Sequence, residues 1–205
     1  MYTLKVENLS KRFGSRRVFS DLSLELATGQ SISITGRNGS GKTTLLMLLL
    51  GLHHATQGRV NYLCNAVPLL ENDIRANTAL VSPYLNLYDQ LTGEENLVFF
   101  ATLSGINLSG KRIDELLATV GLEGRGVDPV GSYSSGMKQR LKYAVALLKE
   151  PAFLFLDEPT SNLDVDGKLL VRQLVESCRR NSIVIIATNE EEDYSLTDGL
   201  IRLGQ

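Results

Sequence analysis

Features that would direct a protein to a membrane or to nucleic acid are scarce in this sequence. The longest apolar run, Leu45–Leu50, is far short of the ~20 residues that a helix needs to span a bilayer. The first residues, Met1–Val6, alternate polar and apolar side chains and lack the apolar centre of a signal peptide. The net charge of −2 includes no basic excess for nucleic acid or an anionic membrane surface. We therefore expect a chain that does not itself span a membrane and does not bind nucleic acid.

Cysteine and histidine are equally sparse. Cys64 and Cys178 lie far apart in sequence and outside any metal-type spacing, so we interpret them as buried thiols of a reducing compartment. His53 and His54 have no carboxylate or cysteine at ligand spacing, which favours a solvated connection over a metal site. With 43% hydrophobic and 21% charged residues, the composition indicates an ordinary globular protein with one sizeable core or a core plus a lobe.

The strongest motif present is the stretch 36–43, Gly-Arg-Asn-Gly-Ser-Gly-Lys-Thr. It matches the phosphate-binding pattern in which Gly is followed, after four residues, by Gly-Lys-Ser/Thr. The alternating residues 31–35 before it predict a strand, and the apolar residues 45–50 after it predict a helix that Gly51 ends. A chance glycine-rich turn is the alternative, and both flanks argue against it. Backbone N–H groups here can wrap a triphosphate, with Lys42 on the β- and γ-phosphates and the Thr43 hydroxyl on Mg²⁺.

A second motif is the apolar run Phe153–Leu156, which is followed by Asp157 and Glu158. Four consecutive apolar residues are typical of a central parallel strand, and α/β sheets bind ligands at the C-terminal ends of such strands. An Asp-Glu pair after a strand is common and alone indicates little. Behind a phosphate loop it predicts Asp157 as a Mg²⁺ ligand and Glu158 as the group that polarises the attacking water.

Periodicity predicts the remaining elements. Strands are expected at residues 2–7, 22–26, 56–62, 79–81, 183–187 and 199–203. Helices are expected at 94–104, opened by a capping box of Thr92 and Glu95, and at 111–120, 137–148 and 166–178. The first two helices should bury Leu97, Phe100, Ala101, Leu103, Ile113, Leu116, Leu117 and Val120. We interpret residues from about 84 to 148 as a helical lobe inserted into an α/β core.

Three further segments are ambiguous on their own. Phe13 could be a core side chain or a partly exposed loop aromatic, and in isolation core is favoured. Residues 134–136 could form a second anion site at a helix N-terminus, although an ordinary capped helix is the simpler interpretation. The acidic run 190–193 is interpreted as a solvated helix start.

In combination, these motifs resemble the nucleotide-binding subunit of an ATP-binding cassette transporter over nearly the full chain. The order of the motifs carries the resemblance: an aromatic loop at Phe13, the phosphate loop, a helical lobe, a signature at 134–137, the strand ending in Asp157-Glu158, then Ser161-Asn162-Leu163-Asp164 and a switch position at 189. The segment 87–97 is also similar to the family's entry to its helical lobe.

The resemblance implies an α/β fold with a three-layer P-loop NTPase core, a parallel central sheet, an N-terminal antiparallel β subdomain and an inserted helical subdomain. The chain is then a single domain over 1–205. Residues 1–83 and 149–205 would form the nucleotide-binding core with the β subdomain, and residues 84–148 the helical subdomain.

The resemblance also implies roles for individual residues. Phe13 would stack on adenine, Lys42 would bind phosphates, Thr43 and Asp157 would hold Mg²⁺, and Glu158 would be the general base, with position 189 beside it. Asp164 would lie at a subunit seam, because the family works as a head-to-tail dimer with two ATP molecules between subunits. The remaining nucleotide contacts would come from Gly36, Arg37, Asn38, Gly39, Ser40, Gly41 and Thr44, and, on the opposite subunit, from Ser134, Ser135, Gly136 and Met137.

This sequence departs from the family pattern at three places. The signature is Tyr-Ser-Ser-Gly-Met in place of Leu-Ser-Gly-Gly-Gln, Ser82-Pro83-Tyr84 stands where a loop glutamine is usual, and Asn189 replaces a histidine. Asparagine can hydrogen-bond a γ-phosphate but cannot carry a proton. The sequence therefore predicts slower, but not absent, ATP hydrolysis.

The resemblance predicts an ATP-hydrolysing subunit that works on separate membrane chains, in a homodimer or heterodimer at the inner face of the cell membrane. The style of the signature helix is similar to that of bacterial exporters of drugs or polysaccharides, and the size also resembles a haem-exporter ATPase. One alternative is a nucleotide-binding regulatory or assembly module with little turnover. A DNA-repair or translation-factor ATPase is disfavoured, because the sequence has one cassette, no long coiled coil and a slightly acidic charge.

Overall fold

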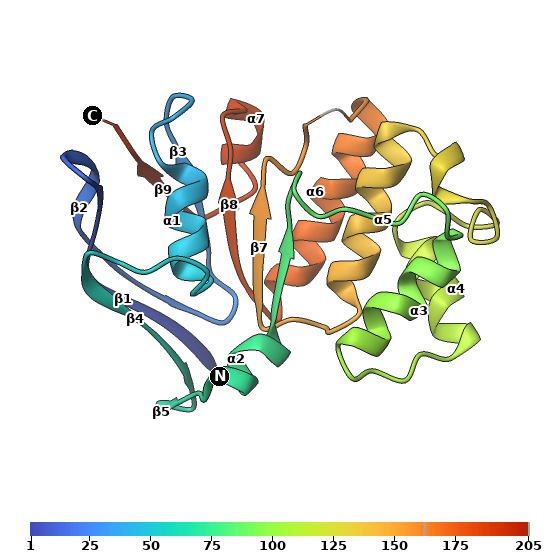
Figure 1. Cartoon of the computed structure of the whole chain (residues 1–205), viewed down its shortest axis with the longest axis horizontal. Coiled ribbons are helices and arrows are strands. Elements are labelled where there is room, and N and C mark those ends of the chain that lie inside the picture. Colours follow the sequence, from blue (N-terminus) through green and yellow to red (C-terminus); the bar gives the residue numbers. More distant parts are fainter. Residues whose placement is uncertain (162, 205) are drawn as a thin grey trace.

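The computed structural model describes residues 1–161 and 163–204. Its centre is a five-stranded parallel sheet with the strand order β6-β7-β8-β3-β9. The strands are β6 (Thr78–Val81), β7 (Phe153–Asp157), β8 (Ile183–Ala187), β3 (Ser31–Thr35) and β9 (Gly199–Arg202). Figure 1 shows this sheet between an antiparallel sheet with α1 on one side and long helices on the other. The predicted three-layer α/β fold is confirmed.

The central strands are buried on both faces, and this explains the apolar sequences of β7 and β8. Every residue of β3, β7 and β8 is buried. In β7, Phe153 and Phe155 pack into a core cluster with α1 and the antiparallel sheet. Leu154 and Leu156 point the other way, into a cluster with α5 and α6. A strand that alternates between two apolar layers needs an apolar residue at every position.

The antiparallel sheet has the order β2-β1-β4-β5. Its strands are β1 (Tyr2–Phe13), β2 (Arg16–Ala27), β4 (Gln57–Cys64) and the short β5 (Val67–Pro68). The first two are longer than predicted because β1 passes through irregularities in its pairing after Val6 and Leu9, where Asn8 has a φ of 48°. Bulges of this kind let a strand continue while it bends. The long β1–β2 hairpin carries Phe13 to the phosphate loop.

The helices follow the predicted pattern with one addition. They are α1 (Lys42–Leu49), α2 (Glu71–Asn77), α3 (Gly93–Leu103), α4 (Gly110–Thr119), α5 (Ser135–Leu147), α6 (Val165–Arg179) and α7 (Glu191–Tyr194), with a 3₁₀ turn η1 at Val130–Ser132. The addition is α2, which the sequence did not predict. None of the helices in the described part of the chain is long and apolar enough to cross a membrane.

The helical part, α3 to α5, shares its core with the parallel sheet. Leu97 of α3 and Leu117 of α4 belong to the same buried cluster as Leu154 and Leu156 of β7. The predicted capping box of Thr92 and Glu95 is confirmed at the start of α3. Of the predicted buried positions, Leu103 is wrong, with 69% of its surface exposed, and Phe100 is only partly buried. Leu103 is the last residue of α3, where the helix no longer faces a neighbour. The division at residues 84 and 148 stays a prediction.

Candidate nucleotide-binding site

The phosphate loop runs from the end of β3 into α1, where the sequence predicted it. Gly36 and Gly41 have φ values of 149° and 104°, in the region that favours glycine. A Cβ on Gly41 would lie 2.1 Å from Val18 Cγ1, and one on Gly36 would lie 2.6 Å from the carbonyl oxygen of Leu203. These two glycines are therefore required by close neighbours as well as by backbone conformation.

Lys42 is buried at the base of the loop, with 6% of its surface exposed. Its Nζ donates to the carbonyl oxygen of Gly36 at 3.0 Å and to Oδ1 of Asn189 at 2.5 Å, and it lies 3.9 Å from Oε1 of Glu158. The amide of Asn189 also donates to Oδ1 of Asn38. The side chain of the switch residue Asn189 thus bonds two residues of the phosphate loop, Asn38 and Lys42.

Thr43 and Asp157 meet across the interface between α1 and β7. The Thr43 hydroxyl donates to the Asp157 carboxylate, with distances of 3.3 and 3.2 Å to its two oxygens. Burial raises the pKa of Asp157, while the bond from Thr43 and the charge of Lys42 lower it. A hydroxyl and a carboxylate oxygen side by side are ligands of the kind that Mg²⁺ prefers. The residues present therefore fit the predicted metal ion.

Glu158 follows β7 in a left-handed conformation, with a φ of 48°. Its backbone N–H donates to the carbonyl oxygen of Ala187 at 2.8 Å, and the N–H of Asn189 donates to its Oε2 at 3.4 Å. Burial raises the pKa of Glu158 against the effects of that N–H and of Lys42. A raised pKa makes a carboxylate a better proton acceptor near neutral pH.

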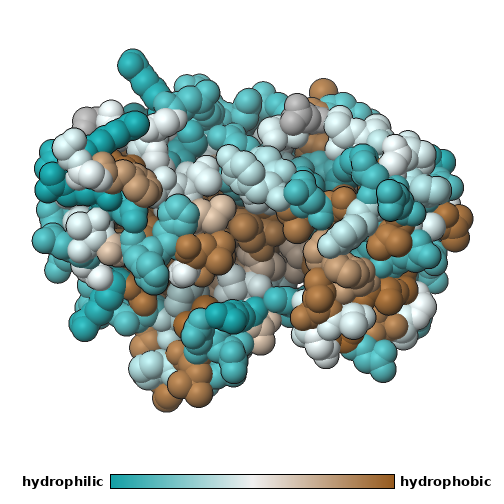
Figure 2. Space-filling view, viewed as in Figure 1, coloured by the Kyte–Doolittle hydropathy of each residue, from teal (hydrophilic) through white to brown (hydrophobic). Residues whose placement is uncertain are grey.

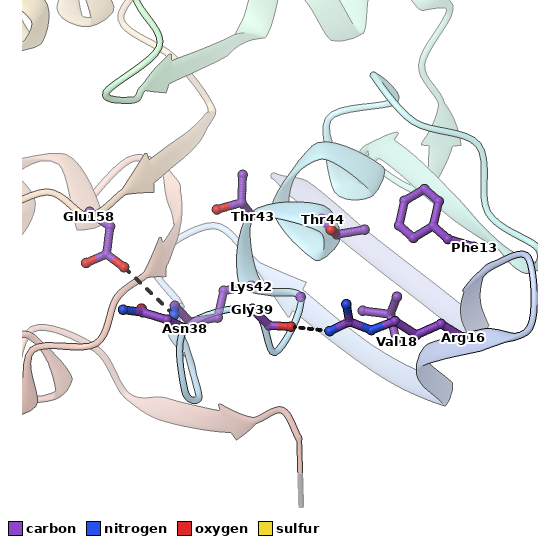
Figure 3. A pocket seen from close by; sticks show the side chains of 10 residues that line it. Phe13, Arg16, Val18, Asn38, Gly39, Lys42, Thr43, Thr44 and Glu158 are labelled. Atoms are coloured by element: carbon purple, nitrogen blue, oxygen red, sulfur yellow. Dashed lines mark hydrogen bonds and ion pairs between the residues drawn. The ribbon is translucent and has the colours of Figure 1, made fainter.

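Lys42, Thr43 and Glu158 line a pocket of about 350 Å³ beside the loop. Figure 3 shows Lys42 and Glu158 on one side and Phe13 and Arg16 on the other. Phe13 is 50% exposed, so the core interpretation is wrong, and it is the last residue of β1 instead of a loop residue. Val18, Asn38, Gly39, Gly41, Thr43 and Thr44 complete the lining.

Arg16 was not predicted as a site residue. Its guanidinium donates to the carbonyl oxygen of Gly39 at 3.0 Å. The sequence offered one signal, a basic pair next to the aromatic residue, but the pair could equally have been a solvated turn. Within the described chain, Ser40 Oγ is buried and has no hydrogen-bond partner. A free donor at this position fits a loop that binds an anion.

The signature segment, residues 134–137, lies outside the pocket that Lys42 lines. Ser134 caps α5 by accepting a bond from the N–H of Met137 at 3.2 Å, and Ser135 and Gly136 follow in the first turn. Among the described residues, the lining of the Lys42 pocket does not include 134–137. Asp164 caps α6 through the N–H of Gly167 at 2.8 Å. Asn162 lies outside the described residues.

The phosphate loop, the carboxylates behind it and the layered sheet define a P-loop nucleotide-binding protein. A family profile described as ABC transporter matches residues 19–161. The Nod factor export ATP-binding protein I of Burkholderia orbicola is 35% identical over 197 residues, which cover 94% of this chain and 65% of that protein. The bacitracin transport ATP-binding protein BcrA of Bacillus licheniformis is 36% identical over 188 residues, which cover 91% and 61%. The chain belongs to the ABC transporter family.

Solved structures agree with this assignment. The structure of an ATP-binding subunit of an ABC transporter superposes with a TM-score of 0.83 at 26% identity, covering 98% of this chain and 85% of that one. A dimeric ATP-binding cassette in a post-hydrolysis state, bound to ADP and Pi, gives a TM-score of 0.81 at 25% identity, covering 98% and 94%. The chain spans 61% to 65% of the length of the two curated relatives named above.

Proposed function

We propose that this chain binds and hydrolyses ATP to power transport, in the direction of export, through separate membrane subunits. One observation carries the proposal. Side chains from three separate parts of the chain meet within hydrogen-bond or ion-pair distance beside the phosphate loop. They are Lys42 and Thr43 from the start of α1, Asp157 and Glu158 from the end of β7, and Asn189 from the segment after β8. The names of relatives that export Nod factor, transport bacitracin or confer daunorubicin resistance support the direction.

In the proposed reaction, the loop N–H groups and Lys42 hold the triphosphate, and Phe13 stacks on the adenine. A water bonded to the Glu158 carboxylate attacks the γ-phosphorus. The bond from that phosphorus to the β–γ bridging oxygen breaks, and ADP and phosphate form. Glu158 accepts the proton of the water, and its raised pKa suits this role.

Thr43 and Asp157 would hold Mg²⁺. When bound, the ion neutralises charge on the β- and γ-phosphate oxygens. Asn189 would then donate its amide N–H to the γ-phosphate, in place of the bond that it makes to Asn38.

A second copy, or a related subunit, would complete each site. Ser134, Ser135 and Gly136 sit at the exposed start of α5, away from their own Lys42 pocket. Their position supports a head-to-tail pair in which each signature segment reaches the γ-phosphate held by the partner. The backbone N–H groups of the first turn of α5 are suited to an anion. Asp164 would then lie at the seam.

The membrane partner would contact the helical part and hold the chain at the cytoplasmic face of the membrane. Figure 2 shows apolar surface gathered over the region of α3. Tyr88, Val98 and Leu103 are 48%, 45% and 69% exposed there, and the Tyr88 ring packs edge-to-face on Phe99 with centroids 4.7 Å apart. Exposed apolar patches of this kind favour a protein contact.

A second candidate is a nucleotide-binding regulatory or assembly module with little turnover. It is favoured by Asn189, which cannot transfer a proton, and by Ser82-Pro83-Tyr84, which offers no glutamine to a bound nucleotide. A single-turnover measurement with excess protein and Mg²⁺ separates the two. Complete absence of ADP formation would support the module.

Two variants test the ATPase proposal. Glu158→Gln should retain ATP binding, lose hydrolysis by ~10² or more, and accumulate an ATP-bound dimer in light scattering. Lys42→Ala should lose tight ATP binding, because its ammonium lies at the base of the loop, bonded to Gly36 and 3.9 Å from Glu158. Retained micromolar affinity in Lys42→Ala, or a monomeric Glu158→Gln protein in ATP, would contradict the assignment.

A further inference from the structure

Asp193 is a buried carboxylate that the proposed reaction does not use. It lies in the short helix α7, and only 1% of its surface is exposed. The Thr188 hydroxyl donates to its Oδ2 at 2.7 Å, and the Thr160 hydroxyl lies 3.0 Å from each of its two oxygens. Both threonines are themselves buried.

These two hydroxyls belong to the two segments that carry the reaction. Thr160 comes two residues after Glu158, in a turn where the N–H of Ser161 donates to the carbonyl oxygen of Glu158 at 3.2 Å. Thr188 precedes Asn189 directly, and its hydroxyl also accepts from the N–H of Glu190 at 3.0 Å. One carboxylate therefore bridges the segment of the general base and the segment of the switch residue.

Stability alone does not account for a carboxylate here. Burial opposes its charge, and in the described chain no lysine or arginine forms an ion pair with it. The nearby Lys168 pairs with Glu192 at 3.2 Å instead. A buried charge held only by neutral hydroxyls costs free energy relative to an apolar side chain of similar size. The carboxylate instead fixes the relative position of two segments, since its oxygens can accept hydrogen bonds from both of them at once.

We propose that Asp193 is a positioning residue, which couples residues 158–161 to residues 188–190 so that Glu158 and Asn189 keep their relative placement. The expected effect of Asp193 on turnover rests on the proposed function. The coupling of the two segments is a structural claim and holds whether or not the protein hydrolyses ATP.

The kinetic test replaces first the hydrogen-bond acceptor, Asp193, and then each donor, Thr160 and Thr188. Asp193→Asn should lower kcat by ~10- to 100-fold, the usual effect of losing an outer-shell hydrogen-bond partner, with the KM for ATP changed less than about twofold because Phe13 and the phosphate loop are untouched. Thr160→Val and Thr188→Val should lower kcat in the same way. Thr160→Ser and Thr188→Ser keep the hydroxyl and should retain most of the activity.

Glu192→Gln is the matched control. It likewise replaces a carboxylate by an amide, one residue earlier, on a side chain that is 70% exposed and paired with Lys168. This variant should leave kcat unchanged. An unchanged kcat in Asp193→Asn, or Ser variants that lose as much activity as the Val variants, would overturn the inference.

Hydrogen–deuterium exchange provides a readout without turnover. Asp193→Asn should speed exchange in peptides covering both 158–161 and 188–190, whereas Glu192→Gln should speed it in neither. If the wild-type protein proves inactive while exchange changes in both segments, the proposed function fails and the coupling stands. Unchanged exchange in either segment overturns the coupling, whatever the activity.

Discussion

At the scale of single residues, position 189 distinguishes this site from the pattern of its family. Asn189 lies two residues beyond the end of β8 and bonds both Lys42 and Asn38. Its amide can orient a phosphate oxygen and a water molecule, but it has no proton to exchange near neutral pH. We therefore propose that the site keeps its contacts to phosphate but has a weakened pathway for the proton.

Asn189→His should therefore raise the steady-state ATPase rate, by about 10²-fold, the lower end of the usual effect of general acid–base catalysis. The rate should also gain a dependence on pH near the ordinary histidine pKa of ~6.5. The measurement is a pH–rate profile of both proteins. An unchanged rate and an unchanged profile would mean that the asparagine is not limiting.

Asp193 gives a prediction about stability and pH. Burial raises its pKa above the usual 3.8 in the folded protein, so the folded state binds this proton more tightly than the unfolded state does. The stabilisation is fully present below the unfolded pKa and is lost as pH rises through the folded pKa. Relative to Asp193→Asn, the wild type should lose unfolding free energy across that window. The measurement is urea unfolding of both proteins from about pH 4, the ordinary pKa of an unfolded aspartate, to about pH 7. If the free energies of unfolding of the two proteins change in parallel with pH, the prediction is wrong.

The sequence predicted site residues where a motif fixes them, and missed residues that reach the site only through the fold. Lys42, Thr43 and Asp157 lie together as predicted because a strand–loop–helix unit and a neighbouring parallel strand constrain them. Arg16 and the Asn189–Asn38 bond depend on pairings between distant segments. No local pattern encodes those contacts.

At the scale of elements, the start of α3 is fixed by a reciprocal cap. The Thr92 side chain accepts from the N–H of Glu95 at 3.1 Å, and Glu95 accepts from the N–H of Thr92 at 2.8 Å. Thr92→Ala should lower the free energy of unfolding by ~1 kcal/mol. Thr102→Ala, in the same helix, is the control and should have little effect, because its hydroxyl only bonds back to the carbonyl oxygen of Val98. Urea unfolding of both variants checks this prediction. If Thr92→Ala and Thr102→Ala lower the free energy of unfolding equally, a specific capping effect is excluded.

Elements were predictable where apolar residues are periodic and unpredictable where they are not. The strands β3, β7 and β8 are apolar or buried throughout, and their predicted bounds match within a residue. The helix α2 has no buried residue, so its sequence carries no amphipathic signal. The length of β1 was missed because Asn8 interrupts the alternation at a bulge, where the strand continues regardless.

At the scale of the whole molecule, the proposed pairing predicts complementation between two inactive proteins. Lys42→Ala removes the phosphate lysine and Gly136→Asp places a charge in the signature. Each should be inactive alone. In a mixed dimer, one of the two sites contains both wild-type elements, so the mixture should recover up to about a quarter of the wild-type ATPase rate. No recovery on mixing would contradict a shared site in a homodimer.

The contact between Gly36 and Leu203 bears on how the protein is made. The carbonyl oxygen of Leu203, just beyond β9, lies 2.6 Å from where a Cβ on Gly36 would be, and the Leu203 N–H donates to the carbonyl oxygen of Thr35 at 2.8 Å. One wall of the phosphate loop thus comes from far along the chain. A nascent chain should therefore lack this wall of the loop until β9 has docked beside β3, and we expect tight capture of nucleotide only after that step.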